Sequence, residues 1–156
     1  MPPAIRLALY QPDIPQNTGA CMRTAACLGV GVDIIGPTGF AFSDKQMKRA
    51  GMDYLDRLEW TNHDSWQTFL RTRGDGGRLI LLTTKAETAY TDFAFAPGDT
   101  LLAGRESAGV PEEVQGAADA RIVVPMAAGM RSLNVAAALA MVLGEALRQT
   151  GSFPEG

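Results

Sequence analysis

Residues 100–111 read Thr-Leu-Leu-Ala-Gly-Arg-Glu-Ser-Ala-Gly-Val-Pro, a short apolar run followed by a loop of glycine and polar residues. Four similar apolar runs occur elsewhere in the chain. All five are continuous rather than alternating in hydrophobicity, which is typical of strands buried on both faces of a parallel sheet. They predict strands at 5–10, 30–35, 79–83, 100–104 and 121–124.

Helical stretches separate these runs. They predict helices at 18–28, 45–50, 65–73, 111–117 and 133–149. In the last of them one apolar stripe recurs at helical spacing, Ser132 or Asn134 can cap the start, and Gly151 can end it. The alternation predicts an α/β fold, a mostly parallel sheet flanked by helices.

Composition limits the class of protein. A chain of 156 residues, 46% hydrophobic and 20% charged, is typical of one globular domain, which we place at 1–156. The net charge is −3, whereas a dedicated nucleic-acid binder is usually basic. Any RNA site must therefore be a local basic patch.

Nothing in the cysteines or the N-terminus indicates an oxidising compartment. Cys21 and Cys27, six residues apart on one predicted helix, point in different directions and cannot bridge. The N-terminus has no apolar signal core, and the longest helical apolar run, 135–143, is too short to span a bilayer. We expect a cytoplasmic protein.

Polar residues and glycines follow four of the predicted strands, at 11–19, 83–85, 104–111 and 125–134. In open α/β sheets, ligands bind outside the carboxyl ends of the strands. These loops therefore predict a binding site at one edge of the sheet. The alternative is that the residues only form turns and cap helices.

Several common sites are excluded. The chain has no Gly-Lys pair and therefore no P-loop, and Gly29-Val30-Gly31 lacks the third glycine of a dinucleotide fingerprint. With one histidine and no Cys-x-x-Cys we expect no metal site, and we interpret His63 as a surface loop residue. A serine hydrolase based on Ser107 is disfavoured, because Arg105 replaces the first glycine of the nucleophile elbow and His63 would be its only base.

Three segments follow patterns that occur together in one known family. Residues 17–23, Asn-Thr-Gly-Ala-Cys-Met-Arg, follow the pattern Asn-x-Gly-x-x-x-Arg. Residues 104–111 follow Gly-x-Glu-x-x-Gly-x-Pro, and Pro125-Met126 is followed by Ser-Leu-Asn-Val at 132–135. In this order and at strand ends, the segments resemble the three motifs of the SPOUT family, the trefoil-knotted RNA methyltransferases, and they cover nearly the whole chain.

Further segments resemble one subfamily, the small enzymes that methylate the ribose 2′-oxygen of the tRNA wobble nucleotide. These are the opening stretch 9–19, Asp44-Lys45 and residues 49–54. The chain departs from the family pattern in the polar Arg105 before Glu106, in Ala136-Ala137, and in the small apolar loop 127–130.

The resemblance implies a C-terminal trefoil knot, a homodimer, and S-adenosyl-L-methionine (AdoMet) as methyl donor, without a metal. Knots are rare among folds, and nothing in composition or periodicity indicates one here. By resemblance, the AdoMet contacts are Leu82, Gly104, Val124, Ser132 and Leu133.

Arg23 is the main catalytic candidate implied by the first motif. A guanidinium is a poor base, so it would orient the ribose, bind its phosphate or stabilise the developing alkoxide. Asn17, Glu106 and Asn134 are further candidates, each with a structural alternative: Asn17 and Asn134 as helix caps, and Glu106 as an acceptor of main-chain N–H bonds that holds a loop.

A local positive strip for RNA can be formed by Lys45, Lys48, Arg49 and Arg57. The alternative is a solvated helix face, with acidic neighbours at 44, 53 and 56. The subfamily implies the tRNA anticodon loop as target. Alternatives are another tRNA or ribosomal RNA target, or a non-catalytic module that binds AdoMet or RNA; the intact motif residues argue against the module.

Overall fold

The computed structural model describes residues 4–39, 56–74, 76–106, 108–130 and 132–156. The predicted helix at 45–50 lies outside these residues. Along the described chain, strands alternate with helices. The elements are β1 (Arg6–Tyr10), α1 (Pro15–Cys27), β2 (Gly31–Ile35), β3 (Trp60–His63), α3 (Trp66–Arg73), β4 (Leu79–Leu82), η2 (Tyr90–Asp92), β5 (Thr100–Ala103), α4 (Glu112–Ala117), β6 (Ala120–Ile122) and α5 (Val135–Thr150).

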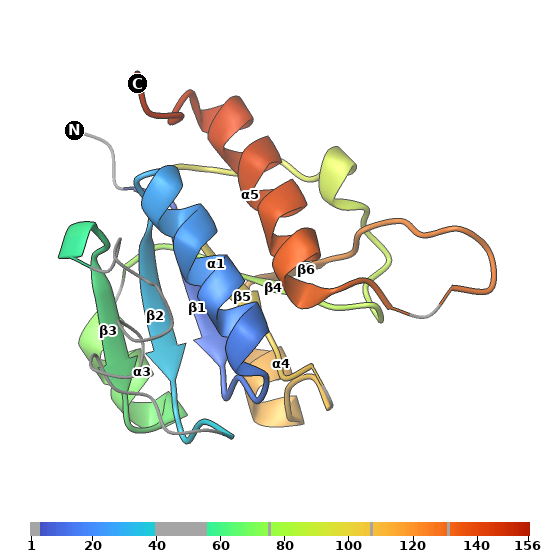
Figure 1. The fold of residues 1–156 in the computed structure, drawn as a ribbon. Helices are drawn as coiled ribbons and strands as arrows, with labels where there is room; N and C mark the ends of the chain where they lie inside the picture. Colours follow the sequence, from blue (N-terminus) through green and yellow to red (C-terminus); the bar gives the residue numbers. More distant parts are fainter. Residues whose placement is uncertain (1–3, 40–55, 75, 107, 131) are drawn as a thin grey trace.

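The strands form one sheet in the order β3-β2-β1-β5-β4-β6, and every pair is parallel. Helices α1 and α5 cover one face, and α3 and α4 lie on the other (Figure 1). The predicted α/β fold with a parallel sheet is confirmed. The implied knot stays a prediction.

Each face of the sheet has its own apolar core. Met22 of α1 and Leu139 and Val142 of α5 pack on the first face, while Phe69 of α3 and Val114 of α4 pack on the second. The stripe predicted for the last helix faces this first core. Central strands are covered on both sides, which explains their continuous apolar runs.

Strand β3 was not predicted. It lies at the edge of the sheet, where Thr61 and Asn62 are exposed, so it carries no apolar run. The short 3-10 helix η2 was also not predicted. Edge strands pair on one side only, and polar side chains there cost little.

The interpretation of His63 as a surface residue is wrong. His63 ends β3, is buried, and donates a hydrogen bond from Nε2 to Asp33 Oδ1 over 2.8 Å. Asp33 Oδ2 accepts from Arg6 Nε at 3.1 Å, and Arg6 Nη1 donates to Glu59 at 2.8 Å. Arg6, Asp33 and His63 thus form a polar network that joins β1, β2 and β3, and sequence position alone gave no sign of it.

Of the two asparagines considered as helix caps, Asn134 caps its helix and Asn17 does not. Helix α5 begins at Asn134, whose Oδ1 accepts from the N–H groups of Ala136 and Ala137 at 2.9 and 3.2 Å, and it ends at left-handed Gly151. Asn17 is not a cap, because α1 begins earlier, with Pro15 in its first turn. The fixed φ of proline is suited to that position.

Both cysteines are free, with Cys21 buried and Cys27 exposed. None of the helices in the described part of the chain is long and apolar enough to cross a membrane.

We expect Asp33→Ala to lower the free energy of unfolding by about 2 kcal/mol, because it leaves the buried imidazole of His63 without its acceptor and leaves Arg6 with Glu59 alone. Chemical denaturation at pH 7 measures this. The exposed Asp92→Ala is the control, and equal stability of the two variants would show that the buried pair contributes nothing.

Candidate functional site

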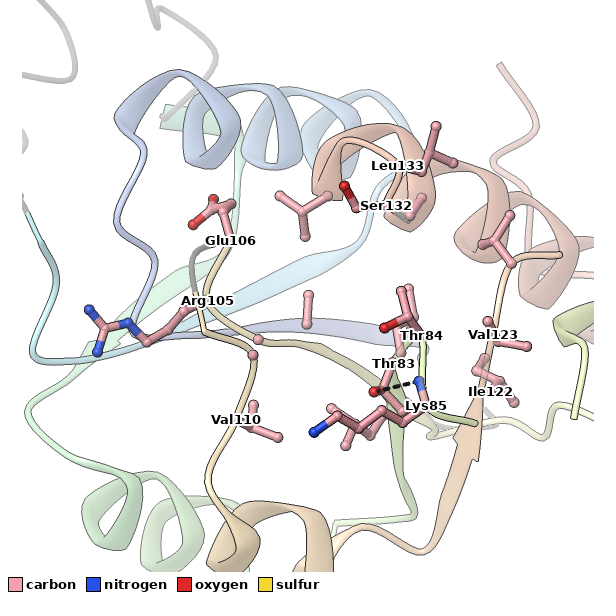
Figure 2. A pocket seen from close by; sticks show the side chains of 18 of the residues that line it. Thr83, Thr84, Lys85, Arg105, Glu106, Val110, Ile122, Val123, Ser132 and Leu133 are labelled. Carbon is pink, nitrogen blue, oxygen red and sulfur yellow. Dashed lines mark hydrogen bonds between the residues drawn. The ribbon is translucent and has the colours of Figure 1, made fainter. Parts of the chain in front are cut away.

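The site is a cavity of about 570 Å³ at the carboxyl ends of β4, β5 and β6, closed on one side by the start of α5 (Figure 2). This volume lies within the range of small-ligand pockets. Five segments meet there because parallel strands bring their carboxyl ends to one edge. The lining comprises Asn17, 81–85, 103–106, 108–110, Gln115, 122–124, Met126, 132–135 and Ala138.

All five residues predicted to contact AdoMet line this cavity: Leu82, Gly104, Val124, Ser132 and Leu133. They come from four segments far apart in the sequence. Asn17, Glu106 and Asn134, three of the four catalytic candidates, line it too. The loops that resemble three family motifs therefore face one space.

A tight turn shapes the wall that follows β5. The main-chain N–H of Arg105 donates to Gly109 O at 3.0 Å, and the N–H of Gly109 donates back at 2.8 Å. A Cβ added at Gly104 would lie 2.7 Å from Gly109 C, and Gly109 itself has φ +66°. Both positions require glycine, one for close approach and one for its backbone conformation.

Asn134 links the two helices of the first face at the cavity. Its Nδ2 donates to Asn17 Oδ1 at 2.9 Å, while its Oδ1 caps α5. The amide is thereby fixed on both sides. Asn134 is thus both a cap and a cavity residue, and Asn17 serves as its partner.

Glu106 accepts the main-chain N–H of Asp13 at 3.2 Å, which confirms the expected loop-holding contact. Burial, a hydrogen bond to the side chain of Asp13 and repulsion from that carboxylate raise the pKa of Glu106. Burial and the charge of Glu106 also raise the pKa of the Cys21 thiol to about 12. Cys21 therefore stays protonated and is no nucleophile at neutral pH.

Arg23 lies elsewhere. It is exposed on α1 and does not line the cavity, so within one chain it is separate from the predicted cofactor contacts. Arg57 is exposed and also outside the lining. The other predicted RNA contacts, Lys45, Lys48 and Arg49, and the disfavoured nucleophile Ser107 lie outside the described residues.

Thr83, Thr84 and Lys85 form one of the loops expected at the site, although no individual role was predicted for them. All three line the cavity, and Thr83 Oγ1 accepts the main-chain N–H of Lys85 at 3.2 Å. In Figure 2 the Lys85 side chain extends toward Val110. Their position after β4 was the available signal.

Among the described residues, no group of three or more His, Cys, Asp or Glu side chains could hold a metal ion. His63 does not line the cavity and is bound to Asp33, which removes it as a base for a hydrolase there. The cavity offers apolar walls, main-chain groups, two threonine hydroxyls at the end of β4 and, among its described lining residues, a single carboxylate. This combination favours binding a flat, partly polar ligand.

Residues 4–144 match the model of the SpoU rRNA methylase family. The chain belongs to this family. A tRNA (cytidine(34)-2′-O)-methyltransferase from Beijerinckia indica subsp. indica is similar, with 60% identity over 148 residues that cover 94% of this chain and 92% of the relative.

Two solved structures extend the comparison. One, described as giving structural insights into the 2-OH methylation of C/U34 on tRNA, has a TM-score of 0.86 and 41% identity, covering 96% of this chain and 92% of the other. An AdoMet-bound rRNA methyltransferase from Sinorhizobium meliloti has a TM-score of 0.82 and 27% identity, covering 95% of this chain and 57% of that longer one. The predicted family is confirmed.

We expect Glu106→Gln to gain stability relative to the wild type as pH rises from about 4 to 8. A raised carboxyl pKa means that folding disfavours the charged form, so the penalty is absent below the unfolded pKa of about 4.3 and complete above the folded one. Glutamine never carries this penalty. Thermal unfolding across pH measures the difference.

The exposed Glu87→Gln is the matched control for the same chemical change. If the stability difference between Glu106→Gln and the wild type does not vary with pH, the raised pKa of Glu106 in the folded protein is contradicted.

Proposed function

We propose that this chain transfers a methyl group from AdoMet to the ribose 2′-hydroxyl of the wobble nucleotide, a cytidine or uridine at position 34 of tRNA. The observation that best supports this proposal is that the five expected AdoMet contacts line one cavity: Leu82, Gly104, Val124, Ser132 and Leu133. The target is supported by the similar relative, which is named for methylation of cytidine 34.

The cavity fits AdoMet in size and chemistry. Leu82 and Val124 provide apolar walls for a purine ring, and Gly104 leaves main-chain groups accessible to its nitrogen atoms. The hydroxyl of Ser132 can bond a ribose. When bound, AdoMet supplies the electrophilic methyl group on its sulfonium.

The chain itself must position the ribose and receive a proton. A bond forms from the 2′-oxygen to the methyl carbon, the carbon–sulfur bond breaks with its electrons left on sulfur, and the hydroxyl proton departs. Glu106 is the carboxylate among the described lining residues, and its raised pKa favours taking up that proton. Asn134, fixed by Asn17, is placed to orient the ribose.

Arg23 remains the proposed catalytic arginine. Because it is exposed on α1 rather than in the cavity, we assign it to the RNA, where a guanidinium can hold a phosphate or stabilise the alkoxide. Lys45, Lys48, Arg49 and Arg57 are the proposed positive strip that binds the anticodon loop.

We further propose that residues 1–156 act as one domain, carry the family's knot and work as a homodimer in the cytoplasm. Exposed apolar side chains on the α1 and α5 side, Ile14 and Met141, support a protein contact there. The free cysteines fit a reducing compartment.

Incubation with methyl-labelled AdoMet and unmodified tRNA, followed by digestion and mass spectrometry, tests the function. We expect label on the ribose of nucleotide 34. Label on another ribose would keep the chemistry and refute the target. Binding of AdoMet without methylation of tRNA or ribosomal RNA would instead favour the non-catalytic module.

In the same assay, Arg23→Ala should reduce turnover by at least about a hundredfold, as losses of transition-state contacts do, and leave AdoMet affinity within about twofold. Arg71→Ala, on the opposite helical layer, is the control. Loss of AdoMet binding in Arg23→Ala would contradict a role toward the RNA.

A further inference from the structure

Four polar side chains meet between the ends of β1 and β5: Gln11, Asp13, Arg105 and Glu106. The proposed methyl transfer uses Glu106 but assigns nothing to Arg105. That residue is also where the sequence departs from the family pattern, by a charged side chain directly before the glutamate. Its surroundings give it a function of its own.

The Arg105 guanidinium is incompletely bonded within the part of the chain that the structure describes. Its Nε is buried and has no hydrogen-bond partner there. Asp13 Oδ2 lies 3.9 Å from Nε, close enough for charge attraction but too far for a hydrogen bond. Nη1 donates to Gln11 Oε1 over 3.4 Å, at the long limit. Of the five N–H donors of this group, only Nη1 donates a side-chain hydrogen bond to another described residue.

Hydrogen bonds hold the main chain on both sides of this guanidinium. Arg105 begins the turn closed by its paired main-chain bonds with Gly109. Gln11 has φ 43°, a conformation rare outside glycine, and its N–H donates to Ile35 O at 2.7 Å. Strained residues of this kind concentrate at binding sites. The main chain at Arg105 and at Gln11 is therefore held in place without a ligand.

The direction of the side chain indicates what it binds. Arg105 is one of the residues that line the cavity, but in Figure 2 its guanidinium extends away from Lys85, Ser132 and Leu133, which lie on the side assigned to AdoMet. Its side chain remains 39% exposed. A ligand that reaches it must lie beside the cavity and come from solvent, as the RNA strand does when its ribose enters.

The planar fork of a guanidinium matches a phosphate group, which can accept two parallel hydrogen bonds. The chain has a net charge of −3, so RNA binding requires local cations of this kind. Asp13 attracts the guanidinium without taking its donors, and it thereby positions the fork.

We propose that Arg105 binds an RNA phosphate next to the methylated nucleotide, with Asp13 and Gln11 as its positioning residues. The inference rests on the proposed function. It adds a contact that fixes the register of the strand at the cavity and that is independent of the positive strip.

Full-length tRNA carrying one neutral methylphosphonate on either side of nucleotide 34 tests this contact. Binding is measured for the wild type, Arg105→Ala, Arg105→Lys and the control Arg71→Ala. We expect Arg105→Ala to weaken binding of unmodified tRNA at least tenfold and to leave AdoMet affinity unchanged, which also shows that the variant is folded. Arg105→Lys should restore part of the loss.

The decisive result is non-additivity. One of the two methylphosphonates should weaken tRNA binding by the wild type about as much as Arg105→Ala does. The same methylphosphonate should have little effect on binding by Arg105→Ala, because that variant has already lost the side chain that contacts the phosphate. If each methylphosphonate weakens tRNA binding by the wild type and by Arg105→Ala to the same extent, the proposal is overturned. The proposal is also overturned if Arg105→Ala binds AdoMet more weakly and tRNA as well as the wild type does. Failure of the wild type to methylate unmodified tRNA would instead refute the proposed function.

Discussion

Strands β1 and β5 pair in parallel in the middle of the sheet, but the chain leaves them toward opposite faces. After β1 it enters α1, which packs on one core, and after β5 it enters α4, which packs on the other. Two connections that diverge from adjacent strands leave a crevice between them. The cavity lies beside this crevice, at the ends of β5, β4 and β6. The contact from Asp13 to Glu106 spans this crevice and ties the two loops together.

The cavity depends on main-chain geometry more than on special side chains. Gly104 and Gly109 let the turn after β5 fold back on itself, and the walls beside it are ordinary strand ends such as Leu82 and Val124. A strand residue can thus be a core residue and a ligand contact at once. Asn134 closes one side of the cavity: its side chain caps α5 and also donates a hydrogen bond to Asn17 of α1.

Sequence patterns predicted the fold class and five of the six strands, because these depend on local apolar runs. The five residues that the family resemblance implies as AdoMet contacts line one cavity, and their contact with the cofactor stays a prediction. Sequence patterns failed where tertiary contacts decide. β3 is an edge strand without an apolar run, and His63 is buried only because Asp33 of the neighbouring strand accepts its hydrogen bond. No local signal reported that Arg23 lies outside the cavity or that Gln11 lies beside Arg105.

Hydrogen exchange with and without S-adenosylhomocysteine, the demethylated product of AdoMet, most directly tests whether these loops form one cofactor site. Slower exchange is expected in residues 82–85, 103–106, 122–126 and 132–135, with β3 unchanged, because a ligand in the cavity would order the lining loops together. Binding that leaves these four segments unprotected, or that protects only segments away from the cavity, would contradict the assignment of the cavity to AdoMet.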